Sequence, residues 1–364
     1  MDLVISFDTE DFATPEALDA AGWWADELAA RGWRGSFQMV GEVVRRLLRE
    51  ERHGILAALA RHEIGTHTDL HSVPPTHAAA LEGVGLEEGL AWVWRNEAPC
   101  MQAILGAFGR VPVSFCKPGS SWAPATLLAH AAMGVKVFCD APFGPAAGYP
   151  FWYAGLLNVR YDLAFDMLYT PDSGAEERFR AAFGRLAETA GDDGVVTLFT
   201  HPNMLVTRRF FDAAYFHGRF VPPGECPPAP LRAAGEIEAA KARVRGALDW
   251  LEHRPGLRII DFATLYAERS RSRRDLAALL DERGIRPGQE GRLPLLEPDG
   301  TEYLAPAAFD SLDLAGWLIL PEGFSGKAIV EQARRLAWTA GAAPKNAVSV
   351  LNREKPRISR CAGA

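Results

Sequence analysis

Two histidines four residues apart, His67 and His71, stand in the segment HEIGTHTDLHS at residues 62–72. Catalytic sites for zinc and similar divalent metals use imidazole and carboxylate ligands, and they usually combine three protein ligands with an open position. Glu10 or Asp11, in the segment FDTED, can complete such a set. The spacing His-x-x-x-His is a weak signal by itself. The pair therefore predicts a metal site only if the fold brings these two segments together.

A hydrolytic site also needs groups that move protons. A bound metal polarises a carbonyl and acidifies water, and a second carboxylate nearby can act as a general base. Asp8, at the end of the apolar run LVISFD, is the candidate for that base. His201, in TLFTHPNML, can donate a proton to a departing amine, because histidine titrates near neutral pH. These residues predict hydrolysis of an amide or ester at a site with one metal ion.

The candidate residues stand at the ends of short apolar runs that alternate with amphipathic stretches. We expect strands within residues 2–8, 34–40, 62–68, 111–119, 135–143, 156–162, 194–201 and 256–262, and helices within 15–33, 53–62 and 87–109. Alternation of this kind predicts a parallel sheet or barrel covered by helices. In β/α barrels the active site lies at the face where the strands end. The polar residues at those ends are therefore expected to share one site.

The arginine-rich segment RSRSRRD, at residues 269–275, is interpreted as a solvated linker or helix start. We expect a domain boundary there, with residues 1–270 forming the barrel and residues 271–364 forming a small α+β appendage of unknown role. Between residues 276 and 350 the pattern predicts a helix, a hairpin with an Asp-Gly turn and a second helix, followed by a loose tail.

Composition limits the partners of the chain. With 48% hydrophobic residues it is a globular protein, and its net charge of −7, without a long basic run, argues against nucleic-acid binding. The apolar runs are too short to span a membrane, and no signal peptide is visible. Five scattered cysteines without a CxxC pair favour reduced thiols. We expect a cytoplasmic protein with a small-molecule or glycan substrate, and a homo-oligomer is left open.

At about residues 1–268 the chain resembles the polysaccharide deacetylases, the NodB-like carbohydrate esterases of family four. ISFDTED is similar to the first motif of that family, and GSFQMVGE resembles the strand that follows it. HEIGTHTDLHS is close to the second motif, His-Ser/Thr-x-x-His, including the preceding Glu-Ile-Gly. FCKPGSSW resembles the third motif, and LFTHP resembles the last, which supplies a histidine.

The resemblance implies a role for each matched residue. Asp8 would be the base that activates water, His67 and His71 would be metal ligands, and His201 would be the acid that protonates the leaving nitrogen. The implied fold is a distorted TIM-like barrel of seven or eight β/α units. The implied cofactor is one divalent ion, Zn²⁺ in the first place, with Co²⁺ or Ni²⁺ as alternatives.

The first and third motifs depart from the family pattern. Thr9 replaces the usual second Asp, so the acidic ligand must be Glu10 or Asp11. Strand alternation places Asp8 and Glu10 on the same side and favours Glu10. In the third motif Cys116 stands where the family has an arginine that orients the base, and Lys117 is one position away. We therefore expect another group, such as a backbone NH or a distant arginine, to orient Asp8.

Four further residues near strand ends are candidates for substrate binding: Lys117, Pro118, Trp122 and Asp140. Asp140 is also a candidate for orienting His201, with a simple turn as the alternative. The function expected from all these residues is removal of an acyl group, in the first place acetyl, from the nitrogen of an amino sugar or related small amide. An allantoinase-like C–N hydrolase and an inactive carbohydrate-binding barrel remain alternatives, although retention of the four matched polar residues argues against the second.

Overall fold

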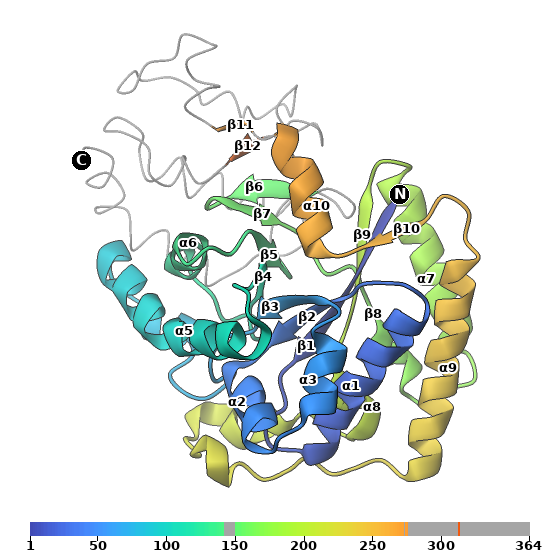
Figure 1. Ribbon diagram of the computed structural model, residues 1–364, viewed down its shortest axis with the longest axis horizontal. Helices are drawn as coiled ribbons and strands as arrows, with labels where there is room; N and C mark the ends of the chain where they lie inside the picture. The colour runs from blue at the N-terminus through green and yellow to red at the C-terminus, as the bar shows by residue number, and fades with distance from the viewer. Residues whose placement is uncertain (142–149, 273, 276–311, 314–364) are drawn as a thin grey trace. The chain divides into compact units, whose positions relative to one another are not determined.

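Strand β1 (Asp2–Thr9) is the longest strand in the described part of the computed structural model (Figure 1). The structure describes residues 1–141, 150–272, 274–275 and 312–313. The fully buried apolar residues of β1 are Leu3, Val4, Ile5 and Phe7. A strand that is buried on both faces carries a nearly continuous apolar run, as is typical of parallel sheets. β1 accordingly has parallel neighbours on both of its edges.

The chain divides into two compact units. Unit 1 comprises Met1–Thr76, Glu97–Pro118 and Tyr161–Thr264, and unit 2 comprises His77–Asn96, Gly119–Arg160 and the described residues from Leu265 onward. The domain boundary expected near residue 270 stays a prediction. The helix, hairpin and second helix expected between residues 276 and 350 lie outside the described residues, apart from the two residues of a short strand.

Unit 1 is built on a parallel sheet. Its strands run in the order β4-β3-β2-β1-β9-β8, and β10 pairs with the first half of β1. The strands that accompany β1 are β2 (Ser36–Met39), β3 (Glu63–Thr66), β4 (Ser114–Cys116), β8 (Leu163–Ala164), β9 (Val195–Thr200) and β10 (Arg258–Ile260). All of these pairs are parallel, so their carboxyl ends meet at one edge of the sheet.

The register of the strands determines which residues meet at that edge. Phe7 lies opposite Thr200, so the next residues along, Asp8 and His201, are brought side by side. On the other side of β1, Thr9 pairs with Met39, Met39 with Thr66, and Thr66 with Phe115. The residues that follow β1, β3 and β4 therefore emerge at the same level.

Helices and short 3-10 segments connect these strands and pack around them (Figure 1). Helix α1 packs against α3 and α8, and α9 packs against α7. The elements concerned are α1 (Pro15–Ala30), α2 (Gly41–Arg49), α3 (His53–Leu59), α7 (Ala175–Ala190), α8 (Pro202–Val206), α9 (Ala234–Glu252), η1 (Phe165–Leu168), η2 (Phe211–Gly218) and η3 (Pro223–Glu225). Helix α5 (Leu86–Phe108) and helix α10 (Phe262–Arg269) each contribute residues to both units.

Aromatic side chains form the core between β1 and the helices. The rings of Phe7 and Phe37 stack at 4.3 Å, and Trp24 of α1 packs on Phe7 at 5.1 Å. The indole Nε1 of Trp24 donates to the hydroxyl of Tyr169 at 3.1 Å, so the polar atom of this buried ring is satisfied. This packing fixes β1 and thereby the residues at its end.

Unit 2 contains α4 (His77–Leu81), α6 (Pro124–Ala132), β5 (Val137–Cys139), β6 (Phe151–Tyr153), β7 (Leu156–Asn158), η4 (Ser270–Ser272), β11 (Arg274–Asp275) and β12 (Leu312–Asp313). β5 and β7 are parallel, whereas β6 and β7 form an antiparallel hairpin. The two turn residues of this hairpin, Ala154 and Gly155, have φ of 56° and 77°, as a type I′ turn requires.

The predicted α/β class is confirmed by the strands. Each of the eight apolar runs contains one, namely β1, β2, β3, β4, β5, β7, β9 and β10, and the three predicted helices correspond to α1, α3 and α5. The alternation of parallel strands with helices is that of a distorted β/α barrel. The short strands β6 and β8 were not predicted.

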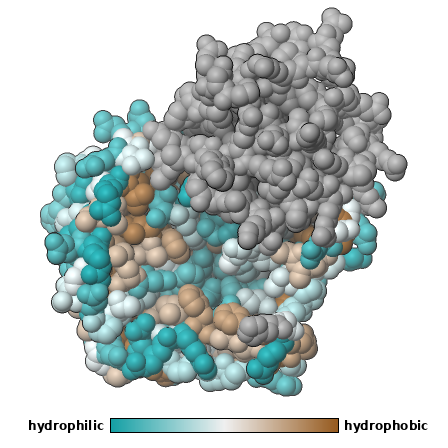
Figure 2. Space-filling model, turned by 180° about the vertical axis from the view of Figure 1, so that it is seen from behind, coloured by the Kyte–Doolittle hydropathy of each residue, from teal (hydrophilic) through white to brown (hydrophobic). Residues whose placement is uncertain are grey.

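Hydrophobic and hydrophilic surface are interspersed on the face drawn in Figure 2. The large hydrophobic side chains that are exposed in the described chain are Leu48, Trp94, Leu105, Val111, Phe216, Phe220 and Leu231. Within the described residues, no helix combines the length and the apolar character that crossing a membrane requires. None of the four described cysteines forms a disulfide.

The side chains around position 65 of β3 leave room only for a glycine. A Cβ atom at this position would overlap Gln38 Oε1 and Ser114 Oγ, two buried groups that hydrogen-bond to each other. We expect Gly65→Ala to lower the free energy of unfolding by about 1–3 kcal/mol, as overpacking does. Gly106→Ala is the control, because nothing lies within 4 Å of its Cβ, and it should be neutral or stabilising. Denaturant unfolding of both variants tests this, and an unchanged midpoint for Gly65→Ala would contradict it.

Candidate active site

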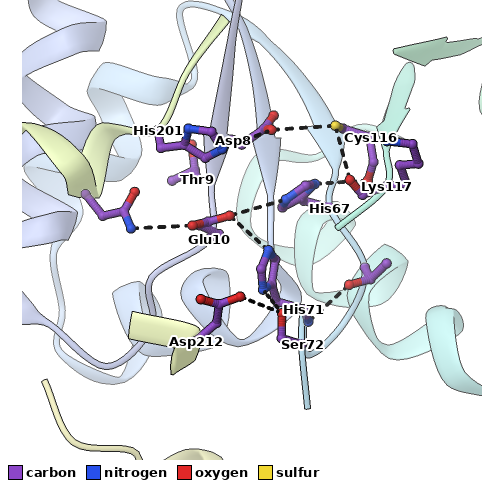
Figure 3. A network of polar contacts seen from close by, with 12 residues as sticks. Asp8, Thr9, Glu10, His67, His71, Ser72, Cys116, Lys117, His201 and Asp212 are labelled. Atoms are coloured by element: carbon purple, nitrogen blue, oxygen red, sulfur yellow. Dashed lines mark hydrogen bonds and ion pairs between the residues drawn. The ribbon is translucent and has the colours of Figure 1, made fainter. Parts of the chain in front are cut away.

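Glu10, His67 and His71 converge just beyond the ends of β1 and β3 (Figure 3). Glu10 Oε2 lies 2.9 Å from His71 Nε2 and 3.6 Å from His67 Nε2. All three side chains are buried, with exposed fractions of 5% or less. The structure thus brings together two imidazoles and one carboxylate from segments that are about sixty residues apart in the sequence.

A tight reversal of the chain after β3 aims both imidazoles at Glu10. Thr68 and His71 have positive φ values of 66° and 53°, which residues with side chains rarely adopt. The hydroxyl of Thr68 accepts a hydrogen bond from the backbone N–H of His71 at 3.0 Å and stabilises this turn. The backbone N–H of His67 donates to Met39 O at 2.9 Å, so the start of the turn is tied to β2.

Each imidazole is held by its other ring nitrogen. His67 Nδ1 lies 2.9 Å from the carbonyl oxygen of Cys116 and must donate to it, because a carbonyl only accepts. His71 Nδ1 lies 2.8 Å from Ser72 Oγ, whose proton is directed to Asp212 Oδ2 at 2.9 Å. Both Nδ1 atoms therefore donate to their outer partners, and the Nε2 atom of each ring faces the Glu10 carboxylate. This is the ring orientation that metal-binding histidines need, with the outer partner fixing the ring.

The electrostatics of this cluster favour a cation. Burial alone would raise the pKa of Glu10, but the imidazoles of His71 and His67 hold it well below its usual range. For His67 burial acts in the opposite direction and would lower the pKa. The negative charge of Asp8, together with the other neighbours of His67, outweighs burial and raises that pKa well above its ordinary value. Asn203 Nδ2 donates to Glu10 Oε1 at 3.4 Å, whereas the other oxygen, Oε2, faces the two imidazole rings.

Asp11, the alternative acidic ligand, serves a different purpose. Its Oδ1 accepts hydrogen bonds from the backbone N–H groups of Ala13 and Thr14, both at 2.8 Å, just before α1. Burial raises the pKa of Asp11 to about 6. Of the two candidates it is Glu10 that lies against His67 and His71, as strand alternation favours.

Asp8 and His201 form a second pair of polar groups beside the first cluster. His201 Nε2 lies 3.8 Å from Asp8 Oδ2, as the pairing of β1 with β9 requires. Asp8 Oδ1 accepts a hydrogen bond from the hydroxyl of Tyr161 at 2.8 Å. The thiol of Cys116 is 3.7 Å from Asp8 Oδ2 (Figure 3). A phenol thus holds one oxygen of the Asp8 carboxylate. A part for a backbone NH or a distant arginine stays a prediction.

His201 is held by Asp166, a residue that the sequence reasoning missed. Asp166 Oδ2 lies 2.6 Å from His201 Nδ1, and Asp166 Oδ1 accepts from the backbone N–H of His201 at 3.0 Å and from Thr200 Oγ1 at 2.6 Å. Burial would lower the pKa of His201, but the Asp166 carboxylate outweighs it and raises that pKa to about 10. This pKa favours a protonated His201 at neutral pH, and Asp166 holds its ring and its backbone N–H. That Asp140 also orients His201 stays a prediction.

The remaining substrate-binding candidates fall into both units. Lys117 and Pro118 are buried directly after β4, and the Cys116 thiol donates to the Lys117 carbonyl at 3.6 Å. Trp122 is 2% exposed and packs on Phe138 in unit 2. Asp140, also in unit 2, follows β5 with a positive φ of 58°. Their roles toward a substrate stay predictions.

No protein-family model and no curated protein matches this chain. Among solved structures it is similar to a protein assigned as a polysaccharide deacetylase from Mycobacterium smegmatis (14% identity, 80% of this chain and 94% of that chain, TM-score 0.48). It is also similar to a family 4 acetyl xylan esterase from Clostridium thermocellum in complex with cobalt, with 16% identity over 74% of this chain and 92% of that chain and a TM-score of 0.38. A third similar structure is a CE4 family pseudoenzyme from Bacillus anthracis, with 10% identity over 72% of this chain and 64% of that chain and a TM-score of 0.40.

These structures belong to the superfamily that the sequence motifs resemble. They include enzymes and a pseudoenzyme, with identities of 10–16% and TM-scores below 0.5. The activity of the chain is therefore inferred from its own side chains.

The cluster predicts that Glu10, not Asp11, is required for metal binding. Glu10→Gln keeps the size of the side chain but removes its charge, and we expect the affinity for Zn²⁺ to fall by at least about a hundredfold. Asp11→Asn is the matched control and should bind the metal as the unmodified protein does. The measurement is metal content after dialysis against Zn²⁺, with affinities from chelator competition. Equal losses in the two variants would show that the assignment is wrong.

The contact between Asp166 and His201 leads to a prediction about the pKa of His201. Asp166→Asn removes the charge that outweighs burial, so the pKa of His201 should fall from about 10 by roughly one to three units. Asp172→Asn is the control, because this carboxylate is exposed and pairs with Arg178 at the surface. Nuclear magnetic resonance titration of the His201 imidazole in both variants gives the result directly. A pKa that stays unchanged in Asp166→Asn would mean that another group keeps His201 protonated.

Proposed function

We propose that this chain is a metal-dependent hydrolase that removes an acyl group, in the first place acetyl, from the nitrogen of an amino sugar or related small amide. The observation that carries the proposal is the presence in unit 1 of two adjacent groups. One is a buried set of two imidazoles and a carboxylate, and the other is a carboxylate–imidazole pair, Asp8 and His201. Together they combine a cation site with a base and an acid.

Glu10, His67 and His71 fit a divalent metal. Their ligand atoms all lie within 4.8 Å of one another, and both imidazoles present Nε2. Three protein ligands of this kind leave a position open for a substrate, as in catalytic zinc sites. When bound, such an ion would polarise the substrate carbonyl and make a nearby water more acidic. Zn²⁺ suits this donor set, and Co²⁺ and Ni²⁺ are alternatives.

Asp8 is proposed as the base. Tyr161 occupies Oδ1, which leaves Oδ2 to take a proton from the attacking water. Asp8 cannot be replaced in this role by Glu10, because both imidazoles of the cluster already engage the Glu10 carboxylate. The carboxylate of Asp8 therefore performs proton transfer and that of Glu10 holds the cation.

His201 is proposed as the acid, and its protonation favours a nitrogen leaving group. An amine leaves only once it is protonated, so cleavage of an amide needs a group that holds a proton at neutral pH. Asp166 keeps His201 in that state by raising its pKa to about 10. After turnover Asp8 holds the proton from water and His201 has lost one. Asp8 Oδ2 and His201 Nε2 lie 3.8 Å apart, so an approach of less than about 1 Å would form the hydrogen bond through which the proton can return.

The proposal predicts metal-dependent release of acetate from N-acetylated sugars. Asp8→Asn and His201→Gln should each lower kcat by on the order of a hundredfold or more while keeping their metal, since general acids and bases contribute that much. His53→Gln, at an exposed histidine of α3, is the matched control. The substrates to compare are free, nucleotide-linked and oligomeric N-acetylglucosamine, with allantoin alongside.

Three outcomes would contradict the proposal. Activity on allantoin alone would establish a different C–N hydrolase. Full activity after complete removal of metal would exclude the role of the cluster. Absence of turnover on every substrate by the metal-loaded protein would support an inactive barrel.

A further inference from the structure

The third motif of this chain has no arginine at the position where the resemblance leads one to expect it. Cys116 occupies that position, is fully buried, and approaches Asp8 Oδ2 at 3.7 Å. A thiol is a weak hydrogen-bond donor and cannot provide the planar, charged fork of an arginine. Another group must therefore fix the direction of the carboxylate if Asp8 is to act as a base.

The hydroxyl of Tyr161 makes the short contact that Cys116 does not. It donates to Asp8 Oδ1 at 2.8 Å and lies 2.7 Å from Ser6 Oγ. A phenol has one proton, and an ionised carboxylate only accepts, so that proton points to Asp8. Ser6 then donates to the Tyr161 oxygen from behind. Two hydroxyl groups in series thus end on one oxygen of the carboxylate.

The two partners of Tyr161 are carried by the same strand. Ser6 and Asp8 are two residues apart on β1 and project from the same face of the strand, so one phenol can bridge them. Both lie in the buried part of β1, with Ser6 fully buried and Asp8 only 5% exposed. The partly buried phenol therefore bridges two buried side chains of β1.

The position of Tyr161 is fixed by β9. Its ring stacks on Phe199 at 4.6 Å with an interplanar angle of 12°. The next residue, Asp162, donates its backbone N–H to Thr197 O at 3.0 Å and accepts from Thr197 N–H through its carboxylate at 2.8 Å. The phenol thus packs on β9, and the residue after it is hydrogen-bonded to the same strand.

We infer that Tyr161 is the positioning residue of the base, holding Asp8 Oδ1 so that Oδ2 faces His201 and the reacting water. The inference rests on the proposed function, since it assigns Asp8 as the base. It has an electrostatic consequence for the same site. A neutral phenol orients the carboxylate without adding a positive charge beside the cluster of Glu10, His67 and His71, where a cation is to bind.

Removal of the phenol oxygen tests the inference. Tyr161→Phe keeps the ring on Phe199 and should lower kcat on the N-acetylated sugar by on the order of ten- to a hundredfold, because a misdirected base loses its alignment with the reacting atoms. KM should stay within about threefold, and Zn²⁺ content should be unchanged, since Tyr161 belongs to neither substrate nor metal binding. Tyr215→Phe, at another buried phenol of unit 1, is the control and should keep the kcat of the unmodified protein.

Ser6→Ala provides a second variant that leaves Tyr161 in place. It removes only the donor behind the phenol, and we expect a smaller loss of kcat, roughly three- to tenfold, because the phenol keeps one partner. Should Tyr161→Phe fail to fold, the Ser6→Ala result decides in either direction. A kcat within twofold of the unmodified enzyme in both variants would overturn the inference while leaving the proposed function intact.

The two proposals fail in different ways. If the unmodified, metal-loaded protein releases no acetate, the proposed function fails and the inference about its base fails with it. If Tyr161→Phe loses Zn²⁺ or melts well below Tyr215→Phe, the phenol has a structural role and the inference is overturned. Loss of kcat with retained metal, KM and melting temperature is the result that supports it.

Discussion

The buried charge of Glu10 is the constraint around which the site is organised. A carboxylate that is only 4% exposed cannot keep its charge unless partners compensate the loss of water. Here the compensation comes from His67 and His71, and their approach depends on a turn with two residues at positive φ. The outer bonds to Cys116 O and Ser72 then fix the rings. Each of these features costs stability or freedom by itself, and together they fit the cation site that we propose.

A single strand supplies both halves of the site. β1 carries Asp8 toward His201 and, two residues later, Glu10 toward the imidazoles. Each residue of the second pair has a further partner: the neutral Tyr161 contacts Asp8, and the carboxylate of Asp166 contacts His201. Both partners come from the short segment around β8, which pairs with β9. The positions of Asp8 and His201 therefore depend on the same strand pairing.

The sequence predicted the groups that face the reaction better than the groups that support them. The strands and the residues at their ends follow from long apolar runs, and alternation along β1 favoured Glu10, whereas Asp11 sits in the turn that leads into α1. Asp166 and Tyr161 could not be found in this way. They flank a two-residue strand without a readable period, and their roles depend on its register with β9. Asp140 became a candidate because it directly follows a strand that a clear apolar run predicts.

The charges of the site also link protonation to metal binding. His67 has a raised pKa because Asp8 and its other neighbours outweigh burial, so in the absence of a cation a proton partly neutralises the cluster. A metal would need that imidazole in its neutral form, so on the proposed function its binding would release the proton. Tyr161 and Cys116 themselves add no positive charge beside Asp8. The missing arginine is thus compatible with a site that retains its attraction for a divalent ion while its base is oriented by a neutral hydroxyl.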